Sequence, residues 1–120
     1  MSFHNLPNYL RTYRRRVGFS QDEVAYLLGV QTGAQVCRYE RHARRPSLET
    51  AWSLEVILGA PARDLFLGDY RKVQGRVIQR AVFLIKKLGA TVSDRRVARK
   101  LETLRGILSA NRAAGVQQQP

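Results

Sequence analysis

The sequence predicts an all-α fold, and three observations lead to this class. Apolar residues recur at three- and four-residue spacing along most of the chain, as on one face of a helix. Serines, glycines and prolines separate these segments at positions typical of helix starts and ends. No stretch alternates apolar and polar residues for long enough to indicate a β-strand. At 120 residues the chain has room for one domain, or for one small domain with an appendage.

Five short helices are expected in the first part of the chain. Ser20 followed by Glu23 indicates a capping box, which satisfies two amides at a helix start. Gly29 suits the end of that helix. Ser47 is expected to cap another helix, and Pro61 suits a first helical position. The predicted helices span 5–17, 20–28, 32–41, 48–58 and 61–66.

Two longer helices are expected after these, over 69–88 and 94–109. Each carries an apolar stripe with basic residues away from it, so the two predict a basic amphipathic helical hairpin. Such a hairpin is too small to be stable alone. It either folds back on the first domain or pairs with a second copy, and we favour the homodimer. The expected divisions are a first domain over 1–67, the hairpin over 68–110 and a disordered tail over 111–120.

The chain is strongly basic. Lys and Arg number 21 against 9 Asp and Glu, and the formal net charge is +12. Residues 1–66 carry +3 of this charge and residues 67–120 carry +9. A charge of this size favours polyanionic partners, which are duplex DNA, RNA or an anionic membrane surface.

Several other functions are not expected. The longest apolar run, 81–85, is far shorter than the roughly 20 residues of a membrane span. Residues 1–10 carry no apolar signal core, so we expect a cytoplasmic protein that does not engage membranes. One cysteine and two histidines argue against a disulfide or a metal site. No phosphate-binding glycine loop, carboxylate pair or nucleophile–base set is present, so neither an enzyme nor a cofactor is expected.

The segment 20–40 carries the pattern that bears most directly on function. It reads SQDEVAYLLGVQTGAQVCRYE, two short helical segments joined through a glycine turn. Ala25 on the first helix is small enough to let the second approach closely. A helix-turn-helix of this kind places its second helix in the major groove of DNA.

The order and spacing of several fragments resemble a known family. The fragments are Ser20-Gln21 with Glu23-Val24-Ala25, Leu28-Gly29-Val30, Arg38-Tyr39-Glu40-Arg41, Arg45-Pro46-Ser47-Leu48-Glu49-Thr50, and Leu58-Gly59 with Asp64-Leu65-Phe66. Over about 6–66 the sequence resembles the helix-turn-helix proteins of the phage repressor and Cro type, also called XRE-type regulators. The resemblance implies a five-helix repressor-type DNA-binding domain. One residue more than the usual pattern falls within 31–34, where the recognition helix begins, so base-facing positions can shift by one.

The resemblance also implies roles for individual residues. The expected recognition face, which contacts DNA bases, comprises Thr32, Gly33, Ala34, Gln35 and Arg38. Gln35 suits adenine and Arg38 suits guanine. The expected phosphate contacts are Gln21 at a helix start, Arg11 and Arg15 on the first helix, and Arg41, His42, Arg44 and Arg45 in the loop after the recognition helix. Arg14 and Glu40 match a pair that forms an internal salt bridge in this family.

The apolar spacing predicts which residues form the core of the first domain. The expected core residues are Val24, Leu28, Val36, Tyr39, Leu48, Trp52, Leu65 and Phe66. Trp52 is assigned to packing because it lies between Leu48 and Val56 on one helical face. His42 is expected to be a solvated loop residue.

The sequence thus predicts a sequence-specific DNA-binding transcriptional regulator, a repressor or activator. It is expected to act as a dimer that places the helix 32–41 in the major groove of operator half-sites. Two alternatives remain. The first is an antitoxin or adaptor that binds DNA and also a protein partner through 68–110. The second is a nonspecific nucleic-acid-binding protein driven by charge.

Overall fold

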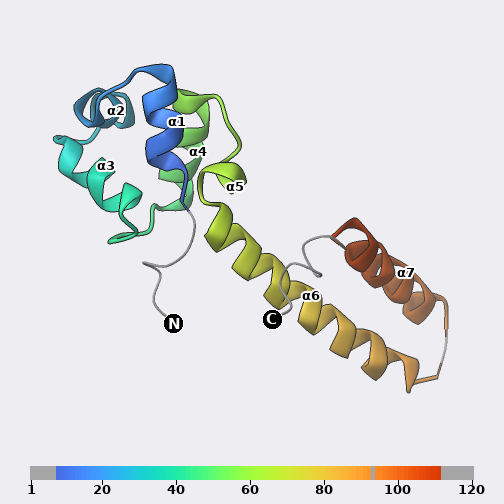
Figure 1. The fold of residues 1–120 in the computed structure, drawn as a ribbon. Coiled ribbons are helices and arrows are strands. Elements are labelled where there is room, and N and C mark those ends of the chain that lie inside the picture. The colour runs from blue at the N-terminus through green and yellow to red at the C-terminus, as the bar shows by residue number, and fades with distance from the viewer. Residues whose placement is uncertain (1–7, 93, 112–120) are drawn as a thin grey trace. The chain divides into compact units, whose positions relative to one another are not determined.

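The computed structural model describes residues 8–92 and 94–111, and these residues form helices and no strand (Figure 1). The predicted all-α class is confirmed. The helices are α1 (Leu10–Val17), α2 (Gln21–Leu28), α3 (Gly33–Glu40), α4 (Leu48–Leu58), α5 (Ala62–Leu65), α6 (Leu67–Gly89) and α7 (Arg95–Ala110). The chain divides into two compact units between Tyr70 and Arg71, inside α6. Of the predicted tail over 111–120, only Asn111 lies within the described residues.

Local signals set the helix ends in the first unit. The Ser20 hydroxyl accepts a hydrogen bond from the Glu23 N–H at 3.0 Å, and the Glu23 carboxylate accepts one from the Ser20 N–H at 2.8 Å. Gly29 ends α2 with a φ of 81°, a left-handed conformation that glycine adopts without strain. α1 begins at Leu10 rather than at the predicted residue 5. Its Leu10 N–H donates to the side-chain oxygen of Asn8 at 2.8 Å.

The capping box makes a testable contribution to stability. Replacing Ser20 with alanine should lower the free energy of unfolding by about 1 kcal/mol, because an N–H at the start of α2 loses its acceptor. Urea unfolding followed by circular dichroism measures this change. Thr12→Ala, at an exposed position on α1, is the control. An equal loss in both variants would contradict a role for the cap.

The core of the first unit lies between α1, α2, α3, α4 and α5. Its most completely buried large side chains are Leu10, Val24, Val36, Leu54 and Leu65. Ala25 is 1% exposed, and α2 and α3 pack closely against each other. Among the predicted core residues, Val24, Val36, Tyr39, Leu65 and Phe66 are buried, and Leu28 packs against the same cluster.

The prediction for α4 was wrong at two core positions. Leu48 is 65% exposed and Trp52 is 58% exposed, and Val56 on the same face is 83% exposed. The helix instead turns Leu54 and Leu58 inward. Because α4 has large apolar residues on both of these faces, helical spacing alone allowed either face to enter the core.

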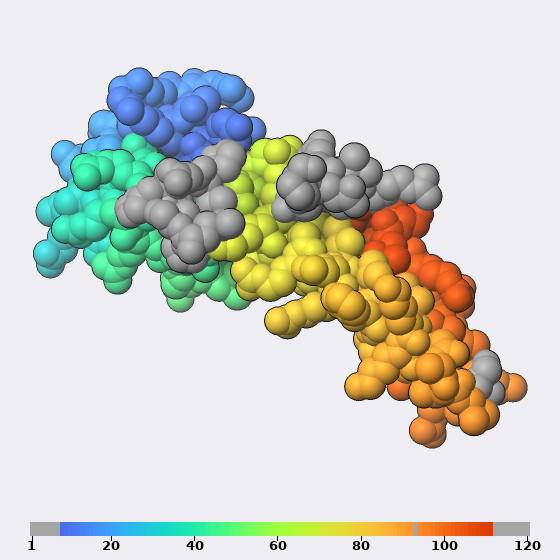
Figure 2. Space-filling view, turned by 60° about the horizontal axis from the view of Figure 1, so that its bottom comes forward, coloured from blue at the N-terminus to red at the C-terminus, as the bar shows by residue number. Residues whose placement is uncertain are grey.

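The second unit pairs the greater part of α6 with α7, which lies alongside it (Figures 1 and 2). Ala81 on α6 and Leu104 on α7 are buried. The Gln74 amide donates a hydrogen bond to the Asn111 side-chain oxygen, which links α6 to the end of α7. Asp94 caps α7 by accepting from the Val97 N–H at 2.9 Å. None of the described helices combines the length and the apolar character needed to cross a membrane.

Candidate nucleic-acid interface

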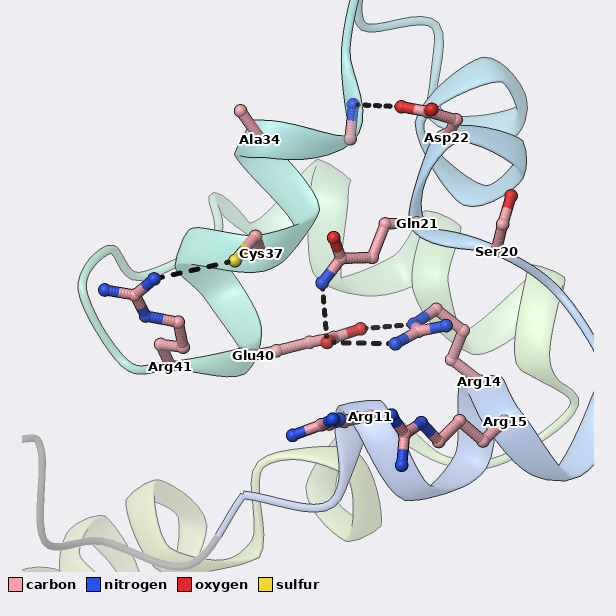
Figure 3. Close-up of a pocket in the computed structure, with 11 residues that line it drawn as sticks. Arg11, Arg14, Arg15, Ser20, Gln21, Asp22, Ala34, Cys37, Glu40 and Arg41 are labelled. Carbon is pink, nitrogen blue, oxygen red and sulfur yellow. Dashed lines mark hydrogen bonds and ion pairs between the residues drawn. The ribbon is translucent and has the colours of Figure 1, made fainter.

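A groove of about 680 Å³ opens in the first unit between α1, the start of α2 and α3 (Figure 3). We call it the α1–α3 groove. Its lining residues are Arg11, Arg14 and Arg15 from α1, Ser20, Gln21 and Asp22 from the start of α2, and Gly33, Ala34, Cys37, Glu40 and Arg41 from α3 and its end. The lining therefore contains four arginines and two carboxylates, so the groove carries a net positive charge.

An ion pair crosses the floor of the groove (Figure 3). Arg14 Nε donates to Glu40 Oε2 at 2.5 Å, and Arg14 Nη2 donates to Glu40 Oε1 at 3.3 Å. Arg14 Nη1 also donates to the Phe19 carbonyl at 2.9 Å. The two charged side chains are 10% and 3% exposed, respectively. The resemblance implied this salt bridge, and the structure places Arg14 and Glu40 in it. The guanidinium of Arg14 therefore forms its bonds within the first unit and is not presented to solvent.

Gln21 completes the arrangement around Glu40. Its Nε2 donates to Glu40 Oε1 at 3.1 Å, so the carboxylate binds groups from both α1 and α2. The resemblance assigned Gln21 to a phosphate contact. In this structure the amide is partly buried and holds the last residue of α3 in place.

The start of α3 is fixed by Asp22. Asp22 Oδ1 accepts a hydrogen bond from the Gly33 N–H at 2.9 Å. A Cβ added to Gly33 would lie 2.7 Å from that oxygen and 3.0 Å from the Asp22 backbone nitrogen, so a larger residue would displace the Asp22 carboxylate and crowd the backbone of α2. Gly33 is itself buried. Its assignment to the base-contacting face is corrected, since it is a packing residue between two helices.

The other residues of the predicted recognition face differ in their surroundings. Thr32 caps α3, and its hydroxyl accepts from the Ala34 N–H at 3.3 Å. Ala34 and Arg38 are exposed, and Gln35 is partly exposed. Gln35 Oε1 accepts from Arg44 at 3.3 Å. The Arg38 side chain forms no hydrogen bond or ion pair with the part of the chain that the structure describes. Its guanidinium is therefore the strongest donor that α3 presents to solvent.

Exposed arginines lie on both sides of the groove. Arg11 and Arg15 project from α1, and neither pairs with any residue in the ranges 8–92 and 94–111 (Figure 3). Arg41 lies at the other side, with one guanidinium nitrogen 3.9 Å from the Cys37 sulfur. Because Arg14 is neutralised by Glu40, these three side chains supply the free positive charge of the groove.

The loop after α3 contradicts one predicted phosphate contact. The His42 side chain is only 7% exposed, and its Nδ1 lies 3.8 Å from Asp69 Oδ2. It is packed inside the first unit rather than solvated, so it is not placed to bind a phosphate. Arg45 lies 3.5 Å from the other oxygen of Asp69, while Arg44 is exposed and bonded to Gln35. Asp69, at the start of α6, is thus an anchor for this loop.

Sequence reasoning missed three residues that shape the interface. Asp22 positions α3, Cys37 lines the groove, and the Asn8 amide donates to the Tyr39 carbonyl at 2.8 Å. Gly33 could have indicated that another element approaches the start of α3 closely, because glycine often stands where backbones come together. That element is the start of α2, which carries Asp22. Nothing in the sequence pattern indicated the Asn8 contact, which joins residues 31 positions apart.

Comparisons of the chain with protein-family models, curated proteins and solved structures found no match.

Proposed function

We propose that the chain is a sequence-specific DNA-binding transcriptional regulator of the phage repressor and Cro type. In this proposal α1–α5 form the DNA-binding domain, α2 and α3 form the helix-turn-helix, and α6 and α7 form a basic hairpin that dimerises. The observation that carries the proposal is the α1–α3 groove, where Arg14 is neutralised internally while Arg11, Arg15 and Arg41 stay exposed.

The charges and the exposed helix suit the two tasks of a DNA-binding surface. Arginines beside the groove attract the phosphate backbone, which sets position and affinity without reading sequence. α3 is short, and Arg38 and Ala34 on it are exposed. An α-helix of this kind fits a major groove, where arginine donates two hydrogen bonds to guanine. A dimer would place two such helices about one helical turn apart.

Selection of bound sequences from a random duplex library at physiological salt tests the proposal. A regulator of this kind enriches a two-fold symmetric site. Tight, salt-sensitive binding without enrichment would contradict it and favour the nonspecific alternative. A heteromeric complex isolated from the protein's own cells, in place of the homodimer, would favour the antitoxin or adaptor alternative.

Cys37 provides a second readout of the same interface. It is the only cysteine of the chain, and it lines the α1–α3 groove. Bound duplex should therefore slow its alkylation by a small maleimide. An unchanged alkylation rate at saturating duplex would place DNA elsewhere on the protein.

Arg38 should control sequence preference. Arg38→Ala is expected to weaken the selected site by about 1–3 kcal/mol and to relax preference at one base pair, because a bidentate contact is lost. Binding to the selected site and to random duplex is compared by fluorescence anisotropy. Arg63→Ala, which removes an exposed arginine from α5, is the matched control. Equal weakening on both duplexes would show that Arg38 binds a phosphate and does not read a base.

A further inference from the structure

One face of α4 is apolar and uncovered. It consists of Leu48, Trp52 and Val56, which recur every four residues and are 65%, 58% and 83% exposed. We call these three residues the α4 face. They lie opposite the side of α4 that enters the core through Leu54 and Leu58. A contiguous set of large exposed apolar side chains marks an interaction surface more often than an isolated one does.

The rim of the α4 face is acidic. Glu49 and Glu55 are exposed, and at 100° per residue they fall on opposite sides of the stripe. They are two of only 9 acidic residues in a chain with 21 basic ones. The face therefore suits a partner with an apolar stripe and a basic rim.

The chain itself carries such a stripe on α6. Val73, Val77 and Leu84 are 49%, 50% and 43% exposed, although they belong to the apolar side of the helix. Arg76 and Arg80, each three residues beyond a valine, form an exposed basic rim along one side of this stripe. We call these five residues the α6 face. The apolar stripes of the α4 and α6 faces are roughly 12 and 16 Å long at 1.5 Å per residue, so the α6 stripe is long enough to cover the α4 stripe.

We infer that the α4 face of one chain binds the α6 face of a second copy. Each chain carries one face of each kind, so two copies supply both partners of the contact at equal stoichiometry. Charge decides against the self-pairings. Two α4 faces would oppose carboxylates to carboxylates, and two α6 faces would oppose arginines to arginines. This inference does not depend on DNA binding, and it concerns residues outside the α1–α3 groove.

Association is measured on the full chain without nucleic acid, by sedimentation over a range of concentrations. Trp52 is the only tryptophan, so its emission reports directly on the α4 face. We expect a dimer at micromolar concentration, with Trp52 emission shifting to shorter wavelength over the same concentrations. A chain that stays monomeric would overturn the inference. This includes a monomer whose Trp52 emission is already at short wavelength, because Trp52 is then covered by a part of the same chain. A dimer with unchanged Trp52 emission would also overturn it.

Two substitutions of equal exposure test the α4 side. Val56→Glu should raise the dimer dissociation constant by roughly 30-fold, because a charge enters the apolar contact. Tyr26→Glu on α2 is the matched control, since Tyr26 is also 83% exposed. It should leave the dissociation constant unchanged. Equal effects of the two substitutions would overturn the assignment.

The α6 side is tested by charge reversal. Arg76→Glu with Arg80→Glu should weaken the dimer by roughly tenfold or more, because carboxylates then replace the arginines that attract the acidic rim of the α4 face. Arg95→Glu with Arg96→Glu changes two exposed arginines of α7 and produces the same net charge. It should have little effect. Stronger dimerisation of the Arg76 and Arg80 variant would indicate that α6 pairs with α6, and would overturn the inference.

Discussion

Replacing Arg14 with methionine should lower the free energy of unfolding by about 3–5 kcal/mol, the cost of leaving a buried charge without its partner. Glu40 is 3% exposed at its side chain and receives two of its three hydrogen bonds from Arg14. Removing the guanidinium leaves a buried carboxylate with Gln21 alone. The Phe19 carbonyl also loses the hydrogen bond from Arg14. Since a domain of this size has about 5–15 kcal/mol of stability in total, the first unit should be close to unfolding.

Urea unfolding followed by far-ultraviolet circular dichroism measures this loss. Arg15→Met is the matched control, because Arg15 is exposed and lies one residue away on α1. Its effect should stay within about 0.5 kcal/mol. The double variant Arg14→Met with Glu40→Gln should be more stable than Arg14→Met alone, because no buried charge remains. If Arg14→Met and Arg15→Met cost the same, the ion pair does not stabilise the domain.

Reversing the charge of Arg11 and Arg15 should reduce affinity for duplex DNA by roughly 100-fold at physiological salt, under the proposed function. Both side chains are exposed beside the α1–α3 groove and are uncommitted within the described residues. Neutralising them by alanine should lower the slope of log affinity against log salt by about two, one for each phosphate contact. Circular dichroism should remain unchanged, because neither side chain supports the core.

Anisotropy titrations at several salt concentrations give both quantities. Arg16→Glu with Arg63→Glu makes the same change in net charge at exposed positions outside the groove lining. This control separates local phosphate contact from overall attraction by a basic protein. Equal losses for the two double variants would mean that the groove is not the binding surface.

The parts of the fold set by neighbouring residues could be predicted from sequence. Ser20 and Glu23 cap α2 as expected, because the capping box involves residues three apart. Gly29 ends α2 for an equally local reason. The pair of Arg14 and Glu40 joins α1 to α3 and is 26 residues apart, so it came from the family resemblance and not from periodicity.

The predictions that were wrong concern features that depend on contacts between distant segments of the chain. Trp52 is exposed because Leu54 and Leu58 fill the core from the other side of α4, a choice that the spacing of α4 leaves open. His42 is buried because Asp69, 27 positions later, lies against it. Gly33 looked like an exposed recognition position, but Asp22 on α2 approaches its backbone.

The way in which α3 is held has a consequence for how such a protein can evolve. Its first residue is fixed through a backbone N–H to Asp22, Tyr39 is held through its carbonyl to Asn8, and Glu40 is held by Arg14 and Gln21. The exposed residues Ala34 and Arg38 make none of these bonds. Under the proposed function, substitutions at those two positions change what the helix recognises while the scaffold keeps its stability, so they need no compensating changes elsewhere in the chain.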